Sequence, residues 1–189
     1  MYEFAGDPQR AAIHDARKQV PRGAVTAHLD GLLACADAWS ATRLVDEALD
    51  LARDMVDADR AVMFRPAGPL MQCVGCRPRQ LGDPLCGDAP VDWFPWGLPQ
   101  VQPRRFLLVD DATGLRLPDG RTLGQVGIAS VVHLPLAGPD AERGALHLHW
   151  AHTVDRWDDR VGALLRAVGS FVLHRVVRAD LPRTQQAPH

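Results

Sequence analysis

The sequence has almost no lysine and no long apolar run. Lys18 is the only lysine beside twenty arginines, a bias that we interpret as the mark of a GC-rich bacterial genome. No run of about 18 apolar residues is present, so no transmembrane helix is predicted. The first ten residues, MYEFAGDPQR, place acidic residues and proline where a secretory signal needs a basic and then an apolar region. We therefore expect a cytoplasmic protein that does not bind membranes.

An excess of charge of one sign is also lacking. The 21 basic and 23 acidic residues are spread along the chain and give a formal net charge of -2. This balance provides no basic stripe of the kind that binds nucleic acids or anionic membranes. With 189 residues, 47% of them hydrophobic, the chain is long enough for one globular domain with its own core.

Catalytic motifs are missing as well. The sequence has no Gly-x-Ser-x-Gly nucleophile motif, no glycine-rich phosphate loop with a lysine, and no His-Glu-x-x-His metal motif. We therefore expect a protein that is not an enzyme. Four cysteines are present, and a cytoplasmic location would keep them reduced, which argues against a disulfide framework.

Apolar residues at helical spacing predict three main helices. The first lies within residues 24–39, the second follows Ser40 and covers residues 41–57, and the third covers about 155–179. A polar segment over residues 8–20 is compatible with one more short helix. We divide the chain accordingly into an N-terminal helical extension (1–40), one domain (41–179) and a polar tail (180–189).

The pattern between the second and third main helices is that of strands. Short apolar segments bounded by turn residues predict five of them, RAVMFRP, LMQCVGC, RFLLVDD, GIASVVHLPLA and RGALHLHWAH. A segment rich in proline and glycine, residues 78–103, is too long for an ordinary connection and predicts a functional or covering loop. The fold class is therefore α+β, with an antiparallel sheet of five to six strands, terminal helices on one face, and loops and short helices on the other.

Several segments carry a resemblance to a known family. They are LVDEALDLARDMVDADRAVMFRP, VDWFPWGLPQVQPRRFLLVDD, GIASVVHLPL, RGALHLHW and DRWDDRVGALLRAVGSFVLHRVV. Over residues 41–179 they resemble a GAF domain, the small-molecule and signal-sensing module of bacterial histidine kinases, transcription regulators and cyclic-nucleotide enzymes. The resemblance implies a sensor that forms a homodimer through parallel terminal helices. No kinase, helix-turn-helix or cyclase segment follows, so we expect a separate signalling effector protein.

Three histidines fall on one side of the predicted sheet. If the strands 126–136 and 144–150 form a hairpin, His133 lies opposite His147, and His149 lies opposite Val131. Strand alternation then directs the three imidazoles away from the helices, toward the loop-covered face where the resemblance implies that ligands bind. There they could coordinate a metal or haem, hydrogen-bond an anionic ligand, or satisfy one another locally.

Large aromatic residues are concentrated in the long loop. Trp93, Phe94 and Trp96 lie within VDWFPWGLP, where such rings would not remain exposed without cause. They could close the open side of the sheet as a lid, or form the wall of a pocket for a planar ligand. Together with Val131 and the three histidines, they are the predicted ligand-binding residues.

The cysteines Cys73, Cys76 and Cys86 form the sharpest local motif. Thiolates at this spacing could hold a metal ion or an iron-sulfur cluster, but the segment contains no fourth ligand. A dithiol redox role and a purely structural role are the other readings. Strand alternation would direct Cys73 and Cys76 to opposite faces unless the strand ends near Gly75.

Three functions follow for testing. The leading hypothesis is a sensory domain without catalytic activity that binds a small molecule or partner and relays the change through its terminal helices. The alternative is a metal or iron-sulfur redox sensor that uses the three clustered cysteines. The third is a small thiol redox enzyme.

Overall fold

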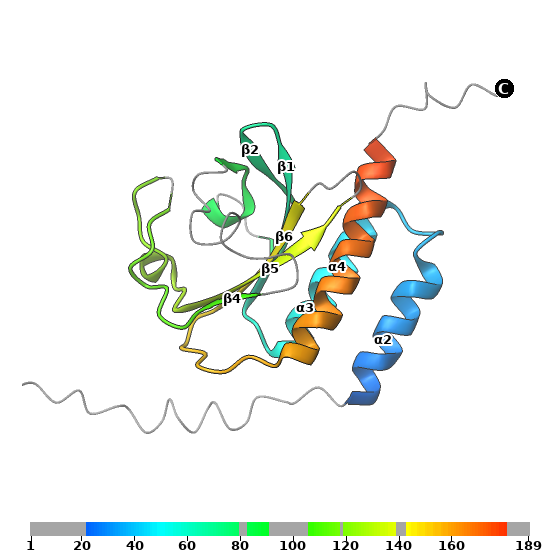
Figure 1. Cartoon of the computed structure of the whole chain (residues 1–189), viewed down its shortest axis with the longest axis horizontal. Coiled ribbons are helices and arrows are strands. Elements are labelled where there is room, and N and C mark those ends of the chain that lie inside the picture. Colours follow the sequence, from blue (N-terminus) through cyan, green and yellow to red (C-terminus); the bar gives the residue numbers. More distant parts are fainter. Residues whose placement is uncertain (1–21, 80–82, 91–105, 118, 139–142, 181–189) are drawn as a thin grey trace, which may run out of the picture.

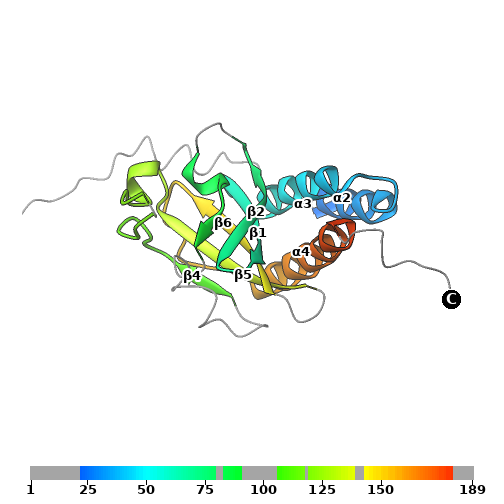
Figure 2. The same cartoon turned by 90° about the horizontal axis from the view of Figure 1, so that it is seen from above.

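The computed structural model describes residues 22–79, 83–90, 106–117, 119–138 and 143–180. Six strands form one sheet, in the order β3-β2-β1-β6-β5-β4, and all neighbouring strands are antiparallel. Three helices lie on one side of this sheet, and the connections that precede β3 and β5 lie on the other (Figure 1, Figure 2). The predicted α+β fold class is confirmed.

The sheet is built from two hairpins joined side by side. The first consists of β1 (Arg60–Ala67) and β2 (Leu70–Arg77), with the short β3 (Ala89–Pro90) at its outer edge. The second consists of β5 (Ser130–Ala137) and β6 (Arg143–Trp150), with β4 (Leu107–Val109) at its edge. The pairing of β1 with β6 joins the two hairpins.

Capping residues define both ends of helix α3 (Ala41–Val56). The hydroxyl of Ser40 accepts a hydrogen bond from the backbone N–H of Arg43, which caps the first turn, and Asp57 ends the helix in the left-handed conformation. The buried side of the helix faces the sheet and consists of Leu44, Val45, Ala48, Leu49, Leu51 and Ala52.

Helix α4 (Asp159–Asp180) packs beside α3 over β5 and β6. The carboxylate of Asp158 accepts the backbone N–H of Arg160 at 2.8 Å, so the helix begins four residues later than predicted, after this cap. The helix approaches β6 closely at Gly144, where a Cβ would lie 2.7 Å from the carbonyl oxygen of Phe64 and also meet Leu173. The main core lies between the sheet and the helices.

Helix α2 (Arg22–Cys35) belongs to the predicted N-terminal extension but packs onto the domain. Leu32 and Ala36 are buried in the same core cluster as residues of α3 and α4. The guanidinium of Arg175 in α4 lies 2.9 Å from the carboxylate of Asp37 and donates to the carbonyl of Ala36. No helix of the described residues is long and apolar enough to cross a membrane.

Three features of the described chain were not predicted. The strand β3 and the short 3-10 helix η1 (Pro84–Cys86) lie inside the long segment 78–103, and a second 3-10 helix, η3 (Gly124–Val126), precedes β5. Each is too short to show a hydrophobic period. The possible helix over residues 8–20 lies outside the described residues.

Candidate functional site

Three histidines project from the face of the sheet that the helices leave free. In the β5–β6 hairpin His133 pairs with His147, and Val131 pairs with His149, which confirms the predicted register. Because side chains alternate along a strand, the residues between them point to the helices. These are Val132, Leu134, Leu136, Leu146, Leu148 and Trp150, and all belong to the main core.

The imidazoles of His133 and His147 are in direct contact. The Nδ1 atom of His133 lies 2.7 Å from Nε2 of His147, so one ring donates an N–H and the other accepts it. The centroid of the His147 ring lies 5.2 Å from that of Phe64 in β1 and 6.0 Å from that of His149. Each of the three histidines exposes at most 3% of its surface.

Burial keeps the three imidazoles neutral. It lowers the pKa of His133 from 6.5 to about 4. It lowers the pKa of His149 to about 3, with a further contribution from the positive charge of Arg60. The pKa of His147 falls well below 6.5 through burial and through its two histidine neighbours. The histidine face therefore presents uncharged rings that act as hydrogen-bond donors and acceptors.

His149 contributes a buried nitrogen that has no hydrogen-bond partner among the described residues. The Nδ1 atom of His149 is buried and unpaired there, although most buried polar atoms in proteins are hydrogen-bonded. Arg60 in β1 pairs with His149 across the sheet and brings a guanidinium next to it. An unpaired imidazole nitrogen in this position suits a ligand with a polar group.

The guanidinium of Arg60 is engaged in a largely buried ion pair. Its Nη1 atom lies 2.5 Å from Oδ2 of Asp83, and the side chains are 15% and 5% exposed. The other carboxylate oxygen of Asp83 accepts the backbone N–H of Leu85 at 3.0 Å, which caps η1. Sequence analysis missed this pair, although an aspartate directly before Pro84 is a helix-start signal.

Apolar clusters flank the histidines on both sides. One lies over β1 and β2 and consists of Val62, Phe64, Met71, Cys76, Ala89 and Ala145, with Cys73 and Cys86 packed against it. The other lies over β5 and consists of Leu85, Ala112, Leu117, Leu123, Ile128 and Val131. The predicted loop-covered face is thus a second, smaller core that contains polar rings at its centre.

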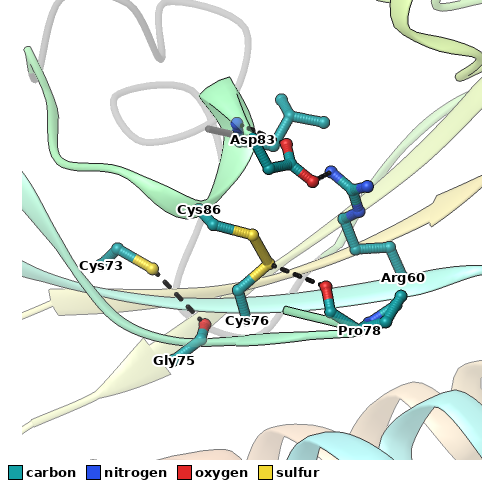
Figure 3. The surroundings of a disulfide bond; sticks show 8 residues. Arg60, Cys73, Gly75, Cys76, Pro78, Asp83 and Cys86 are labelled. Atoms are coloured by element: carbon teal, nitrogen blue, oxygen red, sulfur yellow. Dashed lines mark hydrogen bonds and ion pairs between the residues drawn. A yellow bond between two sulfur atoms is a disulfide. The ribbon is translucent and has the colours of Figure 1, made fainter. Parts of the chain in front are cut away.

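The cysteines differ from their expected reduced state. Cys76 of β2 and Cys86 of η1 form a disulfide, while Cys73 and Cys35 carry free thiols. Figure 3 shows the bond on the side of the sheet away from the helices, with the thiol of Cys73 beside it. The two sulfurs meet because η1 brings Cys86 onto β2, a tertiary contact that the spacing of the cysteines does not reveal.

A β-bulge explains why Cys73 and Cys76 share one face. Met63 of β1 pairs with Gly75 and Phe64 pairs with Cys73, so Val74 is an extra residue in β2. Val74 packs against the helix-side core, whereas both cysteines contact the cluster on the opposite face. Simple alternation predicted opposite faces, and the inserted residue removes that separation.

The three cysteines do not form a metal centre in this arrangement. Two of the sulfurs are consumed by the disulfide, and the described residues contain no group of three or more His, Cys, Asp or Glu placed to hold a metal ion. Burial and the negative charge of Asp88 raise the pKa of the Cys73 thiol to about 11, which opposes the thiolate form that ligands require. The donor set therefore does not fit a metal ion or an iron-sulfur cluster.

The predicted aromatic wall lies outside the described residues, since Trp93, Phe94 and Trp96 fall within 91–105. A hollow of about 300 Å³ lies between the end of α3, the end of β6 and the start of α4. Its walls include Trp150 and Trp157, whose rings meet edge to face. Sequence analysis did not single out this hollow, and none of the three histidines lines it.

The polar residues near the histidine face have structural roles. The hydroxyl of Ser130 donates to the carbonyl of Asp110 at 2.6 Å and accepts the N–H of Val154 at 2.8 Å, so it joins two connections. The carboxylate of Asp111 accepts the backbone N–H and the hydroxyl of Thr113, so it caps a loop. Neither group is oriented as a nucleophile with a base beside it.

Comparison with known proteins identifies the fold. No protein-family model and no curated protein matches the sequence. The phycoerythrobilin-bound GAF domain of a cyanobacterial phytochrome matches with a TM-score of 0.62 and 15% identity, over 82% of this chain and 97% of that one. The phycocyanobilin-bound GAF domain of a cyanobacterial phytochrome matches with a TM-score of 0.60 and 19% identity, over 86% and 98%.

A third similar structure comes from a kinase. The GAF domain of a two-component sensor histidine kinase from Bacillus halodurans matches with a TM-score of 0.56 and 15% identity, over 72% of this chain and 93% of that one. The identities are low, so these comparisons establish the arrangement of the chain. The described sheet order and the helices on one face agree with it. The chain has the fold of a GAF domain.

Proposed function

We propose that the chain is a bacterial, cytoplasmic sensory domain without catalytic activity, and that it binds a small molecule on the histidine face. The observation that carries this proposal is the buried Nδ1 atom of His149, which has no partner among the described residues and lies on the strand position beside Arg60. The ligand class that suits these groups is a small molecule with a polar group and an apolar body. The fold shared with sensor kinases and phytochromes supports the sensory role.

Strand β5 connects the proposed ligand-binding face to helix α4, through which the signal would leave the domain. His133 lies on one side of this strand, and Leu136 lies on the other, where it packs so closely on Gly169 of α4 that a Cβ there would come within 2.8 Å. The backbone N–H of Ala137 also donates to the hydroxyl of Ser170 at 3.0 Å. A displacement of β5 by a ligand would therefore change the position of α4.

The output is proposed to pass through a homodimer to a separate effector protein. The apolar stripes of α3 and α4 that the sequence suggested for dimerisation are largely buried against the sheet. Leu33 of α2 and Phe171 of α4 are exposed by 49% and 36% and remain available for such a contact. Light scattering over a range of concentrations tests this part, and a monomer at high concentration contradicts it.

The two other sequence-based functions receive less support. For the metal or iron-sulfur sensor, the described residues offer no group of three or more ligating side chains. A thiol enzyme needs a nucleophile with a lowered pKa, whereas the pKa of the free Cys73 thiol is raised to about 11. The sensory proposal needs neither chemistry.

A thermal-shift screen of a metabolite library tests ligand binding. We expect at least one compound that raises the melting temperature of the wild type and loses this effect in the His149→Phe variant. His152→Gln is the matched control, because His152 lies in the turn after β6 and outside the histidine face. A set of compounds that stabilise both variants equally, or no stabilising compound at all, contradicts the proposed site.

A further inference from the structure

The segment Asp83–Pro90, called here the covering segment, lies across the histidine side of the sheet. Leu85 is 2% exposed and packs in the same cluster as Val131, which is the partner of His149 in the sheet register. Asp83 holds Arg60, the other neighbour of His149. The covering segment therefore contributes to the burial of the histidine face.

Weak contacts hold the far end of the covering segment. The carboxylate of Asp88 accepts the backbone N–H of Cys73 at 2.9 Å, and Ala89 pairs with Met71 at the edge of the sheet. The strand β3 formed there is only two residues long. Each of these contacts is a single hydrogen bond or a short pairing that opens readily.

The disulfide is the covalent contact between the covering segment and the sheet. It joins Cys86 to Cys76 at a sequence separation of 10. Cys76 is 4% exposed, whereas Cys86 is only partly buried, so Cys86 is the more exposed residue of the pair. Figure 3 shows the Cys86 side approaching from the covering segment and the Cys76 side rising from β2.

We propose that the Cys76–Cys86 disulfide is a redox site that low-molecular-weight thiols or dithiol reductases open, and that its reduction releases the covering segment from the histidine face. In a cytoplasm, the location proposed above, disulfides are rare and are usually transient or redox-sensing. The inference adds a control by redox state to the proposed ligand face. The experiments that test it use no ligand, so their result is independent of the binding proposal.

The chemistry balances with two thiols. A thiolate attacks Sγ of Cys86, the bond between the two cysteine sulfurs breaks, and the electron pair leaves on Cys76, which then takes up a proton. A second thiolate attacks the mixed disulfide and releases Cys86 as a thiol, and the two reductant thiols leave as their own disulfide. The Sγ atom of Cys76 lies 3.7 Å from the carbonyl oxygen of Pro78, so an acceptor for the new S–H is already in place.

Cys73 is not suited to attack the disulfide from within the chain. Its sulfur contacts the carbonyl oxygen of Gly75 at 3.6 Å, and burial together with the charge of Asp88 raises its pKa to about 11. The attacking species in such exchange is the thiolate, which this environment disfavours. The attacking thiol must therefore come from another molecule. The free thiol of Cys73 serves as an internal control in the labelling experiment.

Mass spectrometry on the full chain gives the first test. After purification in air and alkylation in denaturant, we expect two labels on the wild type, at Cys35 and Cys73, and four labels after treatment with dithiothreitol. Four labels without the reductant would overturn the proposal. The same count also identifies the bonded pair, because only peptides with Cys76 and Cys86 should gain label on reduction.

Hydrogen exchange and histidine labelling then test the release. Removal of a crosslink that closes a loop of this length should raise the equilibrium constant for opening of the covering segment roughly a hundredfold. We expect the amide of Cys73, which bonds to Asp88, to exchange faster by about that factor in reduced protein. We also expect diethyl pyrocarbonate to modify His133, His147 and His149 in the reduced protein and to spare them in the oxidised protein.

Two variants separate the disulfide from its surroundings. Cys86→Ser should behave as reduced protein in the absence of dithiothreitol, and Cys73→Ser should follow the wild type in both states. If Cys86→Ser does not fold, the comparison of oxidised and reduced wild type still decides the question. Unchanged exchange and unchanged histidine protection after full reduction would overturn the proposal.

Discussion

The buried histidines predict a steep loss of stability between pH 7 and pH 5.5. In the folded state the pKa of His133 is about 4 and that of His149 is about 3, and the pKa of His147 is also lowered. In the unfolded chain each imidazole titrates near 6.5, at about its ordinary pKa. The unfolded state therefore binds protons first as the pH falls, and it is stabilised relative to the folded state. The contribution is fully present above the unfolded pKa and decreases as the pH falls below it.

The size of the effect follows from the number of histidines. For one imidazole that stays neutral when folded, lowering the pH from 7 to 5.5 reduces the free energy of unfolding by about 1.3 kcal/mol. Three such residues give about 4 kcal/mol, a large part of the 5 to 15 kcal/mol that is roughly typical of a domain. Carboxylates contribute little in this interval because their unfolded pKa values are about 4.

Urea denaturation at the two pH values measures the effect. His147→Leu should reduce the difference between pH 7 and pH 5.5 by about a third, because it removes one of three titrating groups. Val132→Ala is the matched control, since Val132 lies beside His133 in β5 but faces the helices. It should lower stability at both pH values and leave their difference unchanged. A wild type with equal stability at both pH values, or a His147→Leu variant with the full difference, would refute the reasoning.

Three further predictions concern stability at pH 7, measured by chemical denaturation. Cys86→Ser should lower the free energy of unfolding of oxidised protein by about 3 kcal/mol and leave that of reduced protein nearly unchanged, whereas Cys73→Ser should have little effect in either state. Gly75→Ala should cost about 1 to 3 kcal/mol because its Cβ would collide with α3, while Gly31→Ala, in an open part of α2, should stabilise by about 0.5 to 1 kcal/mol. Asp83→Asn should cost about 3 kcal/mol, since it leaves a buried guanidinium without its charge partner, and equal stability of variant and wild type would contradict this.

The helices and strands that are long enough to show a regular spacing of apolar residues were predictable from the sequence. The helices α3 and α4 and the strands β1, β2, β5 and β6 each contain enough residues to show their spacing, and their bounds agree within a few residues. The pairing of His133 with His147 followed from alternation and a short turn, because leucine, valine and tryptophan side chains mark one face of the hairpin. A shift by one residue would have placed the three core residues of one strand on the wrong side.

The parts that depend on a single insertion or on distant partners were not predictable. The extra residue Val74 reverses the alternation of β2 and brings Cys73 and Cys76 to one face, and the neighbouring Gly75 is compatible with either a bulge or a strand end. The partners of Arg60 and Cys76 lie in the covering segment, which has no period of its own. Contacts of this kind are set by tertiary packing.

The chemistry of the histidine face argues that it is kept for function. Three neutral imidazoles at the centre of an apolar layer are costly to bury, and a leucine or phenylalanine of similar size would fill the same space without that cost. His133 and His147 recover part of the cost through their mutual hydrogen bond, whereas Nδ1 of His149 does not recover any from the described residues. On the opposite side of the same two strands the core positions Val132, Leu134, Leu136, Leu146, Leu148 and Trp150 are apolar, and the one buried polar residue there, Ser130, makes two hydrogen bonds. The contrast between the two faces of one hairpin assigns packing to the helix side and supports the proposal that the histidine side binds a ligand.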